Sequence, residues 1–187
     1  MAAITQPAAR EPNLQALPAT QPQLQALDEC HQQVLAKLAE MSRLFVHLED
    51  HGVDTTARSM AQSIVQFFTE SAQRHHADEE RLVFPALLQS GDAELVAHVQ
   101  RLQQDHGWLE EDWLVLAPQL SAIAEGYSWY DLDMLHSALP VFLALYEDHI
   151  ELEESLIYPE ARKRLDQRPQ SGAGRTQSAG RRAQPGS

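Results

Sequence analysis

Apolar residues recur along the chain at alternating steps of three and four positions in four separate stretches. These stretches cover residues 24–48, 60–82, 95–123 and 135–156. Such spacing places one apolar stripe along one face of an α-helix, because a helix turns once every 3.6 residues. The sequence therefore predicts four amphipathic helices that bury their stripes against one another.

The segments between the four stretches carry helix-ending and helix-starting residues. Gly52 and Asp54 separate the first two, Gly91 and Asp92 the next two, and Gly126 begins the third turn. Short turns make successive helices antiparallel. We predict an all-α fold, an antiparallel up-down-up-down four-helix bundle over residues 23–164. Residues 1–22 and 165–187 lack apolar periodicity and predict disordered N- and C-terminal tails.

Composition narrows the function classes. The 187 residues carry a formal net charge of -13, which argues against nucleic acid and anionic membrane surfaces as partners. No apolar run approaches the ~18 residues of a membrane span, and the N-terminus has no secretion signal, so we expect a cytoplasmic protein. A single cysteine excludes a disulfide within the chain and a cysteine-built zinc site.

Six polar residues occupy positions that the stripes reserve for the core. They are His31, His75, Glu79, His106, His149 and Glu153. Burying four imidazoles and two carboxylates is costly unless something satisfies them, and the stripes offer no Lys or Arg at these positions. Counted from the three turns, the four histidines also fall at one height of an antiparallel bundle. We predict that all six are metal ligands.

The six residues form two similar halves. Each half supplies a lone His and a His that is followed by a Glu four residues later, one turn along the same helix face. This arrangement suits two metal ions bridged by two carboxylates. Mixed nitrogen and oxygen ligands favour two iron ions, with manganese or zinc less favoured.

The constellation resembles the hemerythrin-like, or HHE cation-binding, family. The resemblance rests on His31, on the run from His75 and Glu79 to Phe84-Pro85, on His106, and on the run from His149 and Glu153 to Tyr158-Pro159. It implies a four-helix bundle around a non-heme di-iron centre that binds O2 or NO, or that senses iron and oxygen.

The chain departs from the oxygen-carrying members at two positions. Leu102 stands where they have a further histidine, and Glu153 replaces an Asp at a different spacing. The count of four histidines, against five in those carriers, is more similar to the HHE domains of iron-sulfur-cluster repair proteins and iron-sensing ubiquitin-ligase subunits. The repair proteins, however, carry an additional N-terminal domain with a cysteine.

Several other polar residues are excluded from the predicted ligand set. His76 and Glu80 are rotated by about 100° from the stripe, so we expect them to pair with neighbours or to support the ligands. A register change of one residue would bring them in. His47, His51, His98 and His136 lack partners at ligand spacing or lie far along the helices.

The leading hypothesis is a hemerythrin-like di-iron protein that binds a small diatomic ligand, O2 or NO, for sensing, detoxification or iron handling. The alternatives are a redox enzyme at the same site, acting on peroxide, NO or an iron-sulfur cluster with an unknown redox partner, and a structural zinc-binding bundle. Expected partners include neither nucleic acid nor a membrane.

Overall fold

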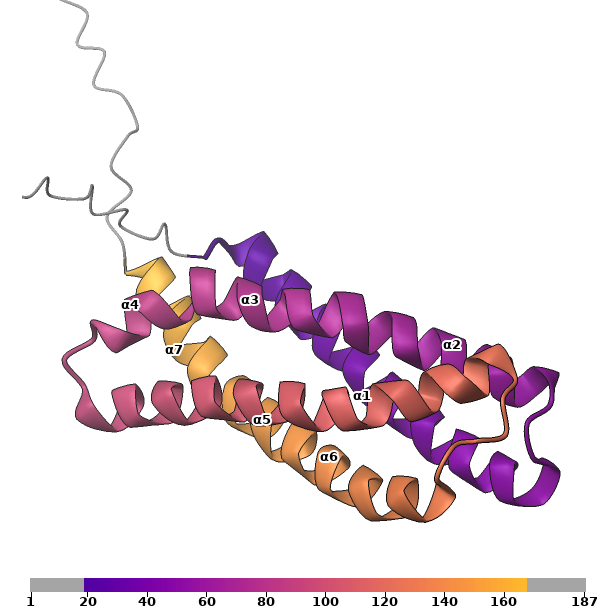
Figure 1. Ribbon diagram of the computed structural model, residues 1–187. Coiled ribbons are helices and arrows are strands. Elements are labelled where there is room, and N and C mark those ends of the chain that lie inside the picture. Colours follow the sequence, from indigo (N-terminus) through magenta and orange to yellow (C-terminus); the bar gives the residue numbers. More distant parts are fainter. Residues whose placement is uncertain (1–18, 168–187) are drawn as a thin grey trace, which may run out of the picture.

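Residues 19–167 are described by a computed structural model and form four long helices, two of them interrupted (Figure 1). The first is α1 (Gln21–His51) and the third is α5 (Ala93–Glu125). The second comprises α2 (Thr55–Gln66), the π-helical η1 (Phe67–Ala72), α3 (Gln73–Leu82) and α4 (Phe84–Leu88). The fourth comprises α6 (Leu132–Leu152), the π-helical η2 (Glu153–Ile157) and α7 (Tyr158–Asp166).

The predicted all-α, up-down-up-down four-helix bundle is confirmed, and its turns form at the residues that predicted them. Gly52 and Gly126 end α1 and α5 with φ of 66° and 87°, a region that a residue without Cβ enters at little cost. The side chains of Asp54, Asp92 and Asp131 accept hydrogen bonds from backbone amides in the first turns of α2, α5 and α6.

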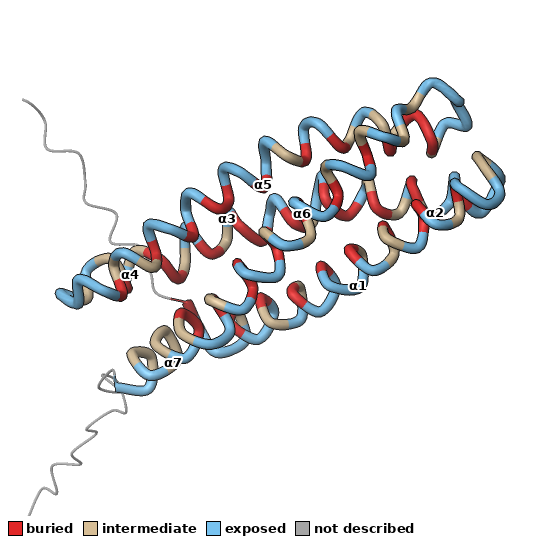
Figure 2. The backbone as a smooth tube through the Cα atoms, turned by 90° about the horizontal axis from the view of Figure 1, so that it is seen from below, coloured by how far each residue is buried: buried red, intermediate tan, exposed pale blue. Residues whose placement is uncertain are grey.

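The apolar core is divided into two clusters by a polar layer. On α1 the layer residue His31 lies between Leu27 of one cluster and Val34 of the other. On α5, His106 lies between Leu102 and Leu109 of the same two clusters. Figure 2 shows the buried residues along the inner face of each helix. The bundle is thus stabilised by apolar packing on both sides of the layer.

The buried stripes of α1 and α5 agree with the prediction, whereas the other two helices are displaced by one residue in places. In the second helix Ala61 and Ala72 are buried, whereas Met60 and Ser71, which fall at the three- and four-residue steps of the predicted stripe, are only partly buried. In a π-helix the hydrogen bonds run from i to i+5, so η1 takes in an additional residue, which accounts for the displacement at Ala72 but not for that at Ala61, which precedes η1.

Helical structure extends slightly beyond the predicted bundle limits of 23–164. Thr20 caps α1, the Ala19 N–H donates to the Leu82 carbonyl at 2.9 Å, and α7 continues to Asp166. Most of the two predicted disordered tails lies outside the described residues. Between residues 19 and 167, none of the helices has the length and apolar character needed to cross a membrane.

Candidate metal centre

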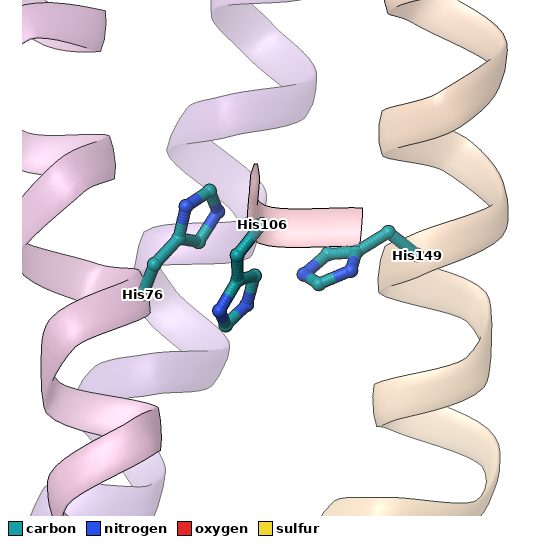
Figure 3. Close-up of side chains that lie close together, drawn as sticks. All are labelled: His76, His106 and His149. Atoms are coloured by element: carbon teal, nitrogen blue, oxygen red, sulfur yellow. The ribbon is translucent and has the colours of Figure 1, made fainter. Parts of the chain in front are cut away.

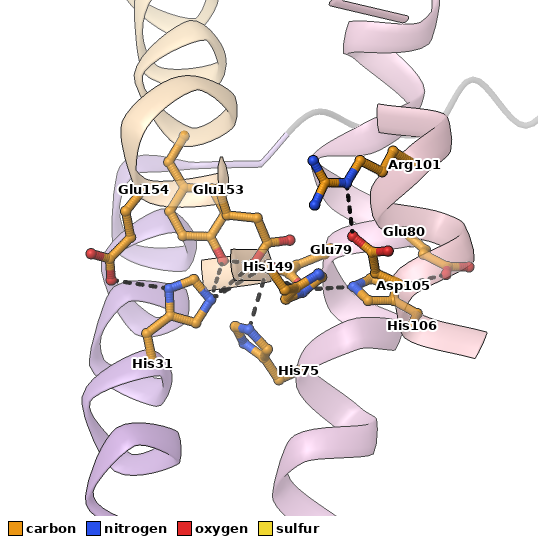
Figure 4. Close-up of polar contacts among 11 residues, drawn as sticks. His31, His75, Glu79, Glu80, Arg101, Asp105, His106, His149, Glu153 and Glu154 are labelled. Carbon is orange, nitrogen blue, oxygen red and sulfur yellow. Dashed lines mark hydrogen bonds and ion pairs between the residues drawn. The ribbon is translucent and has the colours of Figure 1, made fainter. Parts of the chain in front are cut away.

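The structure brings all six predicted ligand residues together in the polar layer (Figure 4). Each of the four helices contributes, and every one of these side chains is buried. The residues and their elements are His31 on α1, His75 and Glu79 on α3, His106 on α5, His149 on α6 and Glu153 at the start of η2. Their binding of metal stays a prediction.

One group of potential ligand atoms comes from His31, His75, Glu79 and Glu153, with all four atoms within 4.8 Å of one another. His31 Nε2 lies 3.1 Å from Glu153 Oε2. His75 Nε2 lies 3.5 Å from Glu79 Oε1, one helical turn along α3. Two imidazoles and two carboxylates thus converge on one point.

A second group uses the same two carboxylates with other histidines. His106 Nε2 lies 3.4 Å from Glu79 Oε2, and His149 Nε2 lies 3.2 Å from Glu153 Oε2. These four potential ligand atoms also lie within 4.8 Å of one another. Glu79 and Glu153 belong to both groups, so each could contact both of two metal ions bound here.

His76 also belongs to the layer, although the sequence pattern left it out of the predicted ligand set and we expected it to pair with a neighbour or to support the ligands. It is 4% exposed, and its ring stacks on His106 with centroids 4.1 Å apart and planes at 11° (Figure 3). His76, His106 and His149 offer three nitrogen atoms within 4.8 Å of one another. The layer therefore contains five histidines rather than four, two on one side and three on the other.

The displaced stripe of the second helix explains why His76 was missed. Burial of Ala61 and Ala72 moves the centre of the inner face by one residue, so that both His75 and His76 reach it. The two consecutive histidines, His75 and His76, were the feature of the sequence that could have indicated a further histidine in the layer. The third histidine on this side of the layer thus comes from α3, whereas Leu102 lies in the apolar core.

Buried polar atoms test whether a metal fits here. Among the described residues, both ring nitrogens of His75, His76 and His149 lack a hydrogen-bond partner, as do both carboxylate oxygens of Glu153. Each unsatisfied buried group costs roughly 1–3 kcal/mol. Metal ions bound between these atoms would satisfy the nitrogens and oxygens that face them. The donor set of imidazoles and carboxylates suits iron.

The imidazoles of the layer differ in how readily they bind a proton. Burial, with smaller repulsion from His31, lowers the pKa of His75 to about 3, and burial holds the pKa of His76 well below its ordinary value. Both rings are neutral near pH 7 and retain a lone pair. For His106, burial opposes protonation, but the neighbouring carboxylates Glu79 and Glu80 outweigh it and raise the pKa.

The two carboxylates differ in their proton affinity. Burial, with smaller repulsion from Glu153, raises the pKa of Glu79 to about 8. Burial opposes the charge of Glu153 as well, but His149 and His31 outweigh this effect and hold its pKa well below the usual range. The metal-free site therefore holds an additional proton on Glu79 near pH 7, which metal ions would displace.

Two further carboxylates orient imidazoles from outside the layer. His106 Nδ1 lies 2.9 Å from Glu80, and His31 Nδ1 lies 3.1 Å from Glu154. A carboxylate only accepts, so each Nδ1 carries the donated proton and each Nε2 faces the cluster, where it could bind a metal ion once it carries no proton. This confirms that Glu80 pairs with a neighbour, and it places Glu154 in the same role.

Two aromatic rings that sequence reasoning did not assign to the site pack against its histidines. Phe84 stacks on His106 with centroids 5.6 Å apart and planes at 17°. Tyr158 stacks on His31 with centroids 5.2 Å apart and planes at 9°. Each ring directly precedes the proline of its motif, which was the signal that pointed to them.

The remaining histidines lie away from the layer, as expected. His47 pairs with Asp54 at 2.9 Å and His136 with Glu49 at 3.1 Å. None of them belongs to a group of potential ligands within residues 19–167.

Comparison with known proteins agrees with the geometry of the layer. Residues 23–161 match the family model described as the Hemerythrin HHE cation binding domain, which accounts for most of the chain. An uncharacterised protein of Haemophilus influenzae is 29% identical over 133 residues, covering 71% of this chain and 75% of that protein. The matched region spans all of the histidines and carboxylates of the layer.

Proposed function

The chain belongs to the Hemerythrin HHE cation-binding family, and from this premise we propose a di-iron protein that binds a small diatomic ligand, O2 or NO. The observation that carries the proposal is the pair of ligand groups that share Glu79 and Glu153. Five buried imidazoles and two shared carboxylates provide nitrogen and oxygen donors for two metal ions, a combination that favours iron.

The two metal positions have unequal donor sets. His76, His106 and His149 would supply three nitrogens to one position, whereas His31 and His75 would supply two to the other. With both carboxylates shared, the two-histidine position receives one protein ligand fewer. It is therefore the position at which a small external ligand has most room to bind.

When bound, a pair of iron ions supplies reversible electron transfer to or from such a ligand. The chain contributes the dry surroundings and the fixed donor geometry. Val34, Leu102 and Leu109 are at most 1% exposed and pack on both sides of the layer, which excludes bulk water. Glu80 and Glu154 hold the tautomers of His106 and His31, so that the ligating nitrogens are oriented before metal arrives.

Sensing, detoxification and iron handling are the roles that this chemistry would serve, and a cytoplasmic location remains the expected one. A redox partner would be needed only if the site turns over. Stoichiometric, reversible binding supports the ligand-binding function, whereas sustained turnover with a reductant would support the redox enzyme instead.

The test is to load the protein with ferrous iron without oxygen and then to add NO or O2 while recording absorption spectra. We expect spectral changes that saturate at one ligand per pair of irons. His75→Leu removes a ligand of the two-histidine position and should abolish the change, whereas His98→Leu, outside every ligand group, should preserve it. An iron-loaded parent protein that gives no spectral change would refute the proposal.

A further inference from the structure

The two halves of the bundle repeat one sequence pattern and one set of contacts. His75 and His149 each precede a pair of glutamates by four residues and an aromatic-proline pair by nine. The second glutamate of each half accepts from the lone histidine of the other half. The aromatic ring of each half, Phe84 or Tyr158, stacks on that same histidine. The halves are thus related by an approximate twofold arrangement.

Besides the additional His76, one atom breaks this arrangement. Tyr158 carries a hydroxyl where Phe84 carries only hydrogen, and both residues are fully buried. The Tyr158 hydroxyl donates a hydrogen bond to Glu79 Oε1 and lies 3.2 Å from His31 Nε2. Both neighbours are potential metal-ligating atoms, so the hydroxyl lies at the edge of the metal centre itself.

The hydroxyl lies on the side with the smaller donor set. His31 belongs to the two-histidine group, and it is absent from the group that contains His76, His106 and His149. The three-histidine position has only the Phe84 ring in the equivalent place. The Tyr158 hydroxyl, which has no counterpart at Phe84, therefore lies beside the position that has more room for an external ligand.

A cavity reaches the same side from the surface. It has a volume of about 230 Å³ and is lined by Cys30, Ser71, Arg74, His75 and Arg81, among other residues. His75 is the second imidazole of the two-histidine group. The wall also holds Asp78, which pairs with Arg81, so the two arginines leave it with one net positive charge, and this charge favours the approach of small anions at this point.

We propose that Tyr158 determines ligand specificity: its hydroxyl donates a hydrogen bond to a ligand at the two-histidine position and favours small anions over neutral diatomics. This inference rests on the proposed di-iron function. A hydroxyl has one proton and rotates about its C–O bond, so the proton that Glu79 Oε1 accepts turns to the ligand when one binds. Hydrogen bonds to a charged acceptor are stronger than those to a neutral one, so the hydroxyl should stabilise a bound anion more than a neutral diatomic ligand.

Azide binding to the ferric protein tests the inference, because azide is a small anion with a strong acceptor atom. We expect Tyr158→Phe to weaken azide binding about tenfold, the loss of one hydrogen bond to a charged group, and to leave NO binding to the ferrous protein nearly unchanged. The ring and its stacking on His31 are retained. Tyr146→Phe, at another buried tyrosine near the layer, is the matched control and should leave azide binding unchanged.

A vibrational measurement separates donation from a packing effect. The azide stretch of the parent should shift between H2O and D2O, and this shift should disappear in Tyr158→Phe. The double variant Phe84→Tyr with Tyr158→Phe moves the hydroxyl to the three-histidine side and should not restore azide affinity. Restoration would overturn the assignment of the donor to one side.

Two other results would overturn the inference. Equal azide affinities in iron-loaded parent and Tyr158→Phe would exclude the donor role while leaving the di-iron function intact. A visible phenolate-to-iron charge-transfer band in the ferric parent, lost in Tyr158→Phe, would make Tyr158 a ligand rather than a donor. A parent protein that fails to take up iron would refute the proposed function, and this inference with it.

Discussion

Replacing His76 with Leu should have opposite effects on the metal-free and the metal-loaded protein. In the metal-free structure both ring nitrogens of His76 are buried without a hydrogen-bond partner among the described residues. Leu removes these polar atoms and keeps an apolar side chain of similar size in the core. In the loaded protein the same change removes one of three nitrogen ligands, so metal binding should weaken.

The magnitudes depend on burial and ligand count. Unsatisfied polar groups cost roughly 1–3 kcal/mol, so metal-free His76→Leu should gain about that much stability. For a bundle of this size, 1 kcal/mol corresponds to about 2–4 °C, which gives an increase in Tm of about 2–12 °C. A metal site held by four ligands is worth about 10–16 kcal/mol, so losing one ligand should cost about 3 kcal/mol, or roughly a hundredfold in affinity.

Thermal melts monitored by circular dichroism, with and without a strong chelator, measure the first effect, and competition with a metal indicator measures the second. His98→Leu serves as the control, because His98 lies half-buried on α5 and outside the ligand groups. If His76→Leu binds both metals with the affinity of the parent, then His76 is a packed core residue and the assignment of five ligating histidines is wrong.

Three further predictions concern the supporting carboxylates, pH and chelation. Glu80→Ala and Glu154→Ala should each lower metal affinity about tenfold, the low end of the range for carboxylates that support metal ligands, because both side chains are about two-fifths exposed. The control Glu151→Ala, exposed on α6, should leave metal affinity unchanged. Equal affinities of parent, Glu80→Ala and Glu154→Ala in a metal-indicator competition would contradict the supporting role of the two carboxylates. Because the pKa of Glu79 rises from 4.5 to about 8 in the metal-free fold, the folded state holds a proton that the unfolded chain releases. As the pH rises from about 6.5 to 8.5, above the range in which His75 titrates, the stability of the metal-free protein should therefore fall while its metal affinity rises. Stability from urea melts and affinity from metal titrations that change in the same direction over this range would contradict the prediction. Chelation should lower Tm by several degrees. Far-ultraviolet circular dichroism should still show most of the helix, since apolar clusters remain on both sides of the layer. An unchanged melting curve after verified metal removal would refute the coupling between metal binding and stability.

The sequence predicted six residues of the layer and missed His76, which lies on the irregular second helix. Along α1 and α5 every position of the predicted stripe is buried, so His31 and His106 fall where periodicity placed them. In the second helix the π-helical η1 breaks the 3.6-residue period, and an argument that assumes a constant period excludes His76. A one-residue rotation within a single helix thus changed the histidine count from four to five.

Contacts between the halves were also beyond pattern analysis. Glu80 and Glu154 lie one residue past the bridging carboxylates, and the group that each accepts from depends on how neighbouring helices pack. The Tyr158 hydroxyl meets Glu79 across 79 positions of sequence. Periodicity indicates which face of a helix is buried, but it does not indicate which side chain of another helix lies opposite.

The central claim is that this layer holds two iron ions, and counting metal per chain tests it most directly. The protein would be reconstituted with ferrous iron without oxygen, freed of loosely bound metal and analysed for iron, manganese and zinc against protein concentration. The five buried imidazoles and two shared carboxylates predict two irons per chain, and one or fewer in a variant that replaces both Glu79 and Glu153 with Ala. Well under one metal ion per chain in the parent, or zinc in place of iron, would contradict the claim.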